Sequence, residues 1–279
     1  MQIIKVPTSL GGLTAAKGAE FAPDKVEAKL KEFWLSENGK LPVFDISEVK
    51  IVKSDISATA KAIFEAVKKA KENFAVVGGD HFISNPSFKA FASNFKNAGI
   101  VGERNEANLT AKRSGAGLVV FDAHPDLMPE MKGSVTHEDW LRELITSETV
   151  AADNIIIVGA RATAKEELKF IREQGIKNFP MKEIAAEGIE SVCDAVMAAA
   201  REFGALYISV DIDAVDPAFA PGTGYIEPGG LTSRELLYFL QRLKLLKNFK
   251  AMDVVEVNPP KDVNEMTSKL AAKILVEMC

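Results

Sequence analysis

Residues 118–126 read LVVFDAHPD, four apolar residues that lead directly into a group of acids and an imidazole. A continuous apolar run is typical of a parallel strand that is covered by helices on both faces. The polar residues that follow, Asp122, His124 and Asp126, would then stand at the carboxyl end of a buried strand. In open α/β sheets, ligands bind at that edge. The stretch therefore predicts both a fold class and the position of a site.

Apolar runs alternate with helical patterns along the rest of the chain. We predict strands at Gln2–Val6, Pro42–Ile46, Phe74–Val77, Gly117–Asp122, Asn154–Val158, Lys177–Phe179, Ala205–Asp211 and Met252–Val257. We predict helices at Pro23–Leu35, Asp55–Asn73, Asn85–Phe95, Glu138–Glu148, Lys165–Gln174, Ile189–Phe203, Ser233–Leu246 and Val263–Glu277. This alternation predicts an α/β fold with one parallel sheet and helices on both faces. Because no linker or internal repeat interrupts it, we interpret residues 1–279 as a single domain.

Composition narrows the class of partner. The chain has 34 Lys and Arg against 39 Asp and Glu, and its net charge is −5. Proteins that bind nucleic acid or an anionic membrane carry clustered excess basic charge, so we expect neither partner. Two cysteines are too few for a disulfide framework, and the N-terminal residues do not resemble a signal peptide. We therefore expect a cytoplasmic protein.

Three further strands of the predicted sheet end in polar residues. The run FAVV leads to His81, ALYISV leads to Asp211 and Asp213, and MDVV leads to Glu256. Because the carboxyl ends of parallel strands lie at one edge of a sheet, we expect these side chains to converge with those of residues 122–126. Two of the three histidines of the chain belong to this set.

Such a set of side chains is suited to binding metal. Carboxylates that share one cleft repel each other unless cations neutralise them. The candidate ligands are His81, Asp122, His124, Asp126, Asp211 and Asp213. Oxygen-rich ligands with some imidazole favour Mn²⁺, while Zn²⁺ and Fe²⁺ remain possible. Two divalent ions would match the four negative charges and could lower the pKa of a shared water.

The motifs GGDH, FDAHPD, SVDIDAVDPAFAPGTG and EVNP occur in this order between Gly78 and Pro259. In this order they resemble the ureohydrolases, the family of arginase, agmatinase and formiminoglutamase. The resemblance implies a three-layer α/β/α sandwich with a parallel sheet of about eight strands. It also implies a two-Mn²⁺ hydrolase that cleaves a small guanidino or amidino compound, releases urea, and forms homo-oligomers, either trimers or hexamers.

The resemblance implies a role for each residue of the site. One Mn²⁺ would be bound by His81, Asp122, Asp126 and Asp211, and the other by His124, Asp122, Asp211 and Asp213. Asp126 would also assist proton transfer to the leaving nitrogen. Glu256 would hold the guanidinium group by charge-assisted hydrogen bonds. His137 stands where the family keeps a histidine that shuttles protons, although it could also be a loop or helix-start residue.

The loops expected to contact the substrate depart from the arginase pattern. Met128 replaces an Asn of arginases, and of an Asp and Glu pair beyond Arg161 only Glu167 is present, with Ala164 at the other position. Arginase-like recognition of an α-amino acid is therefore not expected. We take agmatine as the first candidate substrate, with arginine and formiminoglutamate left open.

A second departure follows His137, where Glu138-Asp139-Trp140 replaces the Gly-x-Pro of the family. Trp140 could bind a substrate ammonium group by a cation–π contact. Alternatively, the two acids form the first turn of a helix. Two other functions also remain open, a deacetylase of the related metal-dependent fold and a metal-binding relative without activity.

Overall fold

The computed structural model describes residues 1–12, 17–71, 73–95, 113–130 and 133–279. Its eight strands form one parallel sheet in the order β2-β1-β3-β8-β7-β4-β5-β6. The strands are β1 (Gln2–Val6), β2 (Asp45–Glu48), β3 (Phe74–Gly78), β4 (Arg113–Phe121), β5 (Ile155–Val158), β6 (Lys177–Phe179), β7 (Phe203–Asp211) and β8 (Phe249–Val255). This confirms the predicted fold class. The interpretation of residues 1–279 as one domain stays a prediction.

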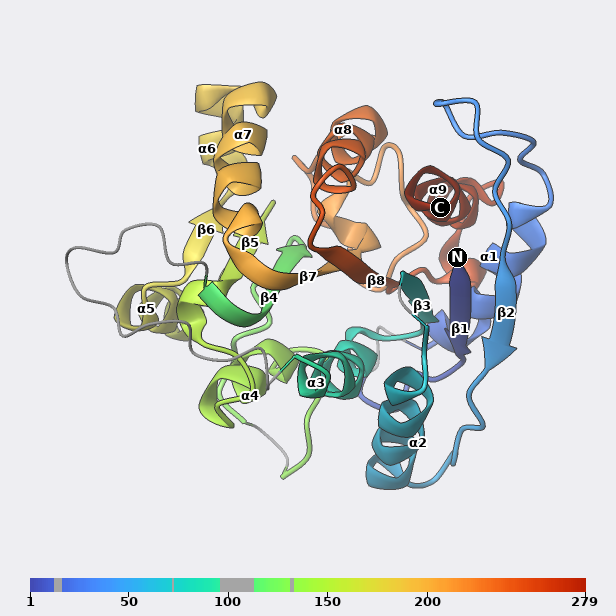
Figure 1. The fold of residues 1–279 in the computed structure, drawn as a ribbon, viewed down its shortest axis with the longest axis horizontal. Coiled ribbons are helices and arrows are strands. Elements are labelled where there is room, and N and C mark those ends of the chain that lie inside the picture. The colour runs from blue at the N-terminus through green and yellow to red at the C-terminus, as the bar shows by residue number, and fades with distance from the viewer. Residues whose placement is uncertain (13–16, 72, 96–112, 131–132) are drawn as a thin grey trace.

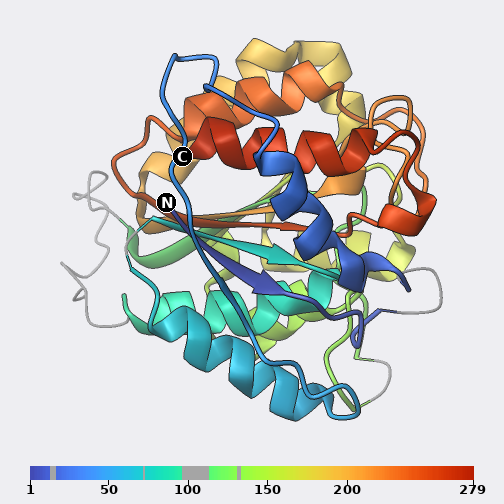
Figure 2. The same cartoon turned by 90° about the vertical axis from the view of Figure 1, so that its right-hand side faces the viewer.

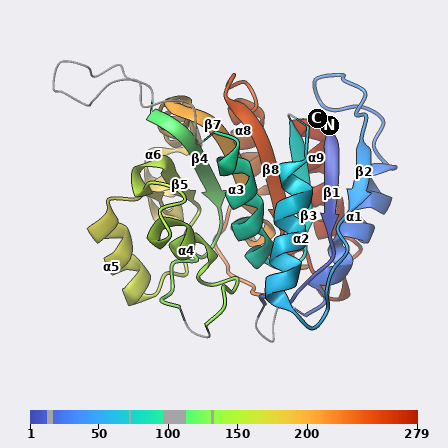
Figure 3. The same ribbon diagram turned by 60° about the horizontal axis from the view of Figure 1, so that its bottom comes forward.

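Helices cover both faces of the sheet (Figure 1). One layer contains α1 (Ala22–Leu30), α6 (Met181–Glu187), α7 (Ile189–Arg201), α8 (Ser233–Leu243) and α9 (Met266–Met278). The other contains α2 (Ile56–Lys68), α3 (Ser84–Ser93), α4 (Trp140–Thr146) and α5 (Lys165–Gln174). Figure 2 shows the sheet edge-on between the layers, and Figure 3 shows the second layer in front. The structure is thus the expected three-layer sandwich.

Some element boundaries differ from the predicted ones. The edge strand β2 runs from Asp45 to Glu48 rather than from Pro42 to Ile46. The strand β4 begins four residues earlier than predicted, because Gly115 interrupts the apolar pattern from which we placed its start. The helix α6 was not predicted, since its seven residues are too few to show a helical period.

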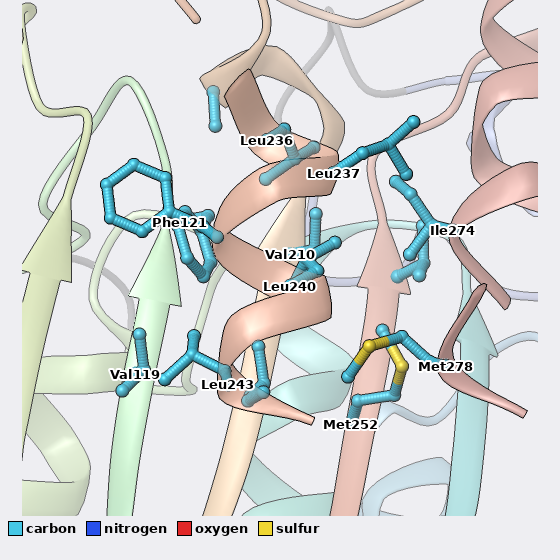
Figure 4. Packing of buried hydrophobic residues seen from close by; sticks show 14 of the residues in the cluster. Val119, Phe121, Val210, Leu236, Leu237, Leu240, Leu243, Met252, Ile274 and Met278 are labelled. Atoms are coloured by element: carbon cyan, nitrogen blue, oxygen red, sulfur yellow. The ribbon is translucent and has the colours of Figure 1, made fainter. Parts of the chain in front are cut away.

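The core between the first helix layer and the sheet is built around α8. This helix has a capping box in which Thr232 accepts from the Glu235 N–H and Glu235 accepts from the Thr232 N–H. Figure 4 shows the apolar side of α8 against residues of β4, β7, β8 and α9, namely Val119, Phe121, Val210, Met252, Ile274 and Met278. The packing of α8 fixes the sheet beneath it.

The four central strands, β3, β8, β7 and β4, carry the polar ends that the sequence singled out. The chain leaves β3 and continues at β4, three positions away in the sheet, and later fills the gap with β7 and β8. Residues far apart in sequence thereby meet at one edge of the sheet. The arrowheads of the strands in Figure 2 point to this edge.

We expect Leu240→Ala to lower the free energy of unfolding by about 2–5 kcal/mol, because it removes a fully buried side chain from the core and leaves a cavity. Leu245→Ala is the matched control, since Leu245 is 74% exposed just beyond the same helix. Urea unfolding measures both. Equal effects would contradict the placement of α8.

Candidate metal centre

The side chain of His81 is the meeting point of three carboxylates. It follows β3 in a short 3₁₀ helix (His81–Ile83), and its Nδ1 lies 3.1 Å from Asp122 Oδ2 and 3.0 Å from Asp126 Oδ2. Asp211, at the end of β7, places Oδ2 3.3 Å from the same nitrogen. All four side chains are buried. Strands β3, β4 and β7 therefore supply one group of ligand atoms.

A second group forms beside the first. His124 Nδ1 lies 3.0 Å from Asp213 Oδ2 and 3.6 Å from Asp122 Oδ1. Each group offers one ligand atom per residue within 4.8 Å of one another, His81, Asp122 and Asp126 in the first and Asp122, His124 and Asp213 in the second. Asp122 belongs to both. The six predicted ligands are thus brought together as expected.

The donors in this cluster fit divalent cations. His81 Nδ1 and Asp122 Oδ2 are buried without a hydrogen-bond partner. Burial, together with the neighbouring carboxylates, raises the pKa values of Asp211 and Asp213. Carboxylate oxygens combined with imidazole nitrogens suit metals such as Mn²⁺. A cation would relieve the repulsion and occupy the unpartnered atoms.

A hydrogen-bonded chain behind His81 fixes its ring. Ser209 Oγ donates to Asp253 Oδ1 at 2.6 Å, which leaves its oxygen as the acceptor for His81 Nε2 at 2.9 Å. Tyr207 and Ser84 also donate to Asp253. A proton is thereby held on Nε2, so Nδ1, which faces the carboxylates, is the nitrogen that can bind a metal ion once its own proton is displaced. We did not predict Ser209 or Asp253 from the sequence. The signal was Ser209 two residues before Asp211, on the same side of β7.

A cavity of about 240 Å³ opens onto the cluster. It is lined by His81, His124, Asp126, Met128, His137, Glu138, Ala162, Ala164, Glu167, Asp211, Asp213, Thr223, Tyr225 and Glu256. The predicted residues Asp126, His137, Glu167 and Glu256 are therefore in it. Tyr225 was missed as a lining residue, although its Gly- and Pro-rich stretch follows the Asp211–Asp213 motif.

Glu256 lines this cavity and has one carboxylate oxygen without a hydrogen-bond partner. Its Oε1 accepts from the backbone N–H of His81 at 2.9 Å and contacts His137 Nδ1 at 3.1 Å. Its Oε2 is buried without a partner. The residue has a φ of 61°, in the left-handed region that is unfavourable for glutamate. Backbone strain of this kind is found preferentially at functional sites.

His137 combines a buried ring with an acidic partner. Burial opposes protonation of the imidazole, but the hydrogen bond and charge of Glu256 outweigh it and raise the pKa of His137 to about 9. Its ring lies 5.9 Å from that of Tyr225, centroid to centroid. His137 is therefore a cationic cavity residue at neutral pH, not a solvated loop residue.

The other two candidate substrate contacts have different surroundings. Glu167 lines the cavity, but its Oε1 accepts from the Leu127 N–H and its Oε2 from the Ala164 N–H. It therefore anchors the loop that follows Asp126. The structure does not bring Trp140 to the cavity. Trp140 is fully buried as the first residue of α4. Glu138 and Asp139 lie in the turn before this helix rather than in its first turn, and Glu138 lines the cavity.

Metal affinity should rise with pH. Burial opposes protonation of His81, but the carboxylates of Asp122, Asp126 and Asp211 around its Nδ1 outweigh burial and raise its pKa. The pKa of Asp126 is raised to about 7 by burial and by the charge of Asp122. These groups hold protons at neutral pH that a metal ion must displace. We expect Mn²⁺ to bind more tightly at pH 8.5 than at pH 6.5, with release of protons.

Calorimetry in two buffers of different ionisation enthalpy measures that release. Glu37→Gln is the control, because Glu37 is a surface carboxylate bound to Arg234, and it should behave as the parent protein does. Affinity that does not depend on pH would contradict the proton-holding cluster.

The comparisons with known proteins agree with this geometry. A model described as the Arginase family matches residues 1–279. The formimidoylglutamase of Halalkalibacterium halodurans is 31% identical to this chain, with 98% of this chain and 84% of the relative covered. The agmatinase of Bacillus subtilis (strain 168) is 30% identical, with 94% and 84% covered. The solved formimidoylglutamase of Bacillus subtilis subsp. subtilis str. 168 has a TM-score of 0.87 at 25% identity, with 99% and 85% covered.

In the part of the chain that the structure describes, no helix has both the length and the apolar character to span a membrane. The match of the family model to residues 1–279 and the buried His/Asp cluster favour this family over the deacetylase alternative. The chain belongs to the Arginase family, the metal-dependent hydrolases that act on guanidino and amidino compounds.

Proposed function

We propose that this protein is a two-Mn²⁺ ureohydrolase whose substrate carries a guanidinium group and a cationic or uncharged tail, with agmatine as the first candidate and urea as a product. The observation that carries the proposal is that Glu256, whose buried Oε2 has no hydrogen-bond partner, lines a cavity next to the His/Asp cluster. No Lys or Arg is among the described residues that line this cavity.

Each group of ligand atoms would hold one ion. Asp122 would bind both ions. Asp211, whose Oδ2 lies 3.3 Å from His81 Nδ1, would bind the first ion. Paired divalent ions supply Lewis acidity, which makes water a nucleophile near neutral pH. The donor set supports Mn²⁺ over metals that prefer thiolates. Location in the cytoplasm and assembly into trimers or hexamers stay predictions.

Glu256 would bind the reacting end of the substrate. A guanidinium or amidinium group offers N–H donors and a positive charge, and Oε2 is a buried carboxylate oxygen without a donor. Charge-assisted hydrogen bonds of this kind are short and directional. Glu256 would thus hold the carbon that is attacked in front of the cluster, and the backbone N–H of His81, which donates to Oε1, fixes the orientation of its carboxylate.

Two cavity residues would move protons. Hydrolysis breaks the bond between the amidine carbon and the leaving nitrogen, and that nitrogen takes up a proton as the amine departs. Asp126 lines the cavity beside the cluster and would pass the proton on. His137 is protonated at neutral pH and would exchange protons between this site and solvent.

The charge of the cavity wall supports a substrate tail without a carboxylate. Glu138 lines the cavity, and Glu227 Oε1 lies 3.6 Å from His124 Nε2 at its edge. Acids at these positions attract an ammonium group and repel carboxylates. Met128 and Ala164 add apolar surface where arginases have polar side chains. Agmatine has an ammonium tail, whereas arginine adds a carboxylate.

Similarity to two formimidoylglutamases supports formiminoglutamate as the second candidate. That compound carries an amidine in place of a guanidine, so its hydrolysis would release formamide rather than urea. Its two carboxylates would meet the acidic wall described above. Measurement of urea and formamide in the same assay therefore separates the candidates.

The number of ions can be tested by mutation. We expect the parent protein to bind two Mn²⁺ per chain, Asp122→Asn to lose high affinity for both, and His81→Ala to lose it for one, because Asp122 belongs to both ligand groups and His81 to one. Metal analysis after equilibrium dialysis gives the stoichiometry. A parent protein that binds at most one ion at saturating Mn²⁺ would rule out the two-metal proposal.

The substrate can be tested with the Mn²⁺-loaded protein and a panel of agmatine, arginine, 4-guanidinobutanoate and formiminoglutamate. We expect agmatine to have the highest kcat/KM. Glu256→Gln keeps the shape and removes the charge, so kcat/KM should fall by a factor of about 10–100, from the roughly 1.5–3 kcal/mol of a charge-assisted hydrogen bond.

Glu138→Gln is the matched comparison for Glu256→Gln, since it removes the charge of another cavity-wall residue that does not belong to the His/Asp cluster. It should raise KM for agmatine and leave kcat near that of the parent. Strong preference for arginine or formiminoglutamate would overturn the assignment of the tail, and full activity of Glu256→Gln would overturn the role of Glu256.

A further inference from the structure

The indole of Trp140 contacts two residues of the first ligand group from behind. Its Nε1–H donates to Asp126 Oδ2 at 2.7 Å, and its ring centroid lies 4.5 Å from that of His81 with an interplanar angle of 40°. Trp140 is fully buried, so neither contact is shared with solvent. Among the described residues, none of the carboxylates of the second group accepts a hydrogen bond from this indole.

The position of Trp140 is fixed by its own neighbours. It begins α4, and its carbonyl oxygen accepts from Asn85 Nδ2 at 3.1 Å. The turn that precedes it is held by Asp139 Oδ1, which accepts from the backbone N–H and the hydroxyl of Thr136. The indole is thus a rigid donor rather than a mobile one.

Asp126 depends on such a donor. Its φ of 53° lies in the left-handed region, and its Oδ2 faces both the indole N–H and His81 Nδ1, at 3.0 Å. The fixed N–H sets the rotation of the carboxylate, and the ring behind His81 limits the rotation of the imidazole. Hydrogen bonds that orient metal ligands contribute strongly to metal affinity.

The second ligand group has a more open setting. The side chain of His124 is 27% exposed, whereas that of His81 is 1% exposed. The ring of Tyr225 lies 5.8 Å from that of His124 between centroids, in an edge-on arrangement. The two groups therefore differ in how firmly the protein holds them.

From these contacts we infer that Trp140 is a positioning residue that orients Asp126 and His81, and so sets the affinity of the first metal ion independently of the second. The inference rests on the proposed two-metal centre. It assigns Trp140 a function on the metal side of the site, in place of the cation–π contact with substrate that the sequence left open. Trp140 acts through two ligands and does not touch the substrate.

Intrinsic fluorescence tests this inference without altering the site. The chain has two tryptophans, and Trp34 is 85% exposed, so Trp34→Phe leaves Trp140 as the sole tryptophan, whose emission is excited selectively at the red edge of the absorption band. We expect the binding of Mn²⁺ at the first ligand group to change the emission of Trp140 in this variant. The response should persist when Asp213→Asn weakens the second group, and His81→Ala should abolish it.

A mutation then tests the hydrogen bond. Trp140→Phe keeps an aromatic ring next to His81 and removes the N–H donor. We expect one of the two Mn²⁺ ions to bind about 10–100-fold more weakly and the other to keep its affinity. Leu144→Ala is the matched control, because it truncates a fully buried side chain of the same helix and core. It should lower the unfolding temperature and leave both affinities unchanged.

The outcomes separate the inference from the proposed function. If the Trp34→Phe protein binds no Mn²⁺ by dialysis and metal analysis, the proposed metal centre fails, and the inference fails with it. If two ions bind but Trp140 emission does not respond, or if Trp140→Phe changes neither affinity or both equally, only the inference is overturned. If Trp140→Phe does not fold, the inference is decided by whether Mn²⁺ changes the emission of Trp140 in the Trp34→Phe protein.

Discussion

Repulsion among buried aspartates at the carboxyl edge of β4 and β7 is the constraint on which the site depends. Four carboxylates in one small volume cannot all be charged without nearby positive groups. The protein supplies part of the compensation itself, because the backbone N–H of His124 donates to Asp122 and the backbone N–H of Ala123 donates to Asp213. Two imidazoles add positive charge, and the atoms left without partners, such as Asp122 Oδ2, mark where cations complete the balance.

The order of the strands makes this concentration of charge possible. His81 follows β3, Glu256 follows β8, and the aspartates follow β7 and β4, which are neighbours in the sheet. Chain segments more than a hundred residues apart thus meet at this edge of the sheet. Close approach also needs the glycines of the GGDH motif, since a Cβ on Gly79 would lie 1.8 Å from the carbonyl oxygen of Thr8. The backbone at the end of β3 could not otherwise pass so close to the loop after β1.

The sequence predicts well whatever depends on strand ends alone. Apolar runs locate the central strands, and the residues that follow them, such as His81 and Asp211, converge because parallel strands end at one edge. It predicts poorly whatever depends on which donor faces which acceptor across the fold. Ser209 and Asp253 lie within apolar strands and show their role only when the register of β7 and β8 pairs them directly. Glu167 likewise matches a family substrate contact, yet backbone donors occupy both of its oxygens.

The segment from His137 to Trp140 shows why substitutions near an active site cannot be assigned to substrate specificity by position alone. Three residues apart, its two ends face opposite sides of the site. His137 lines the cavity and pairs with Glu256, whereas Trp140 lies behind the cluster and donates to Asp126. A change in this segment can therefore alter which substrate charge the cavity prefers, the affinity for metal, or both. Since Asp126 and His81 both border the cavity and belong to the first ligand group, they are the residues through which a change on the buried side reaches the substrate.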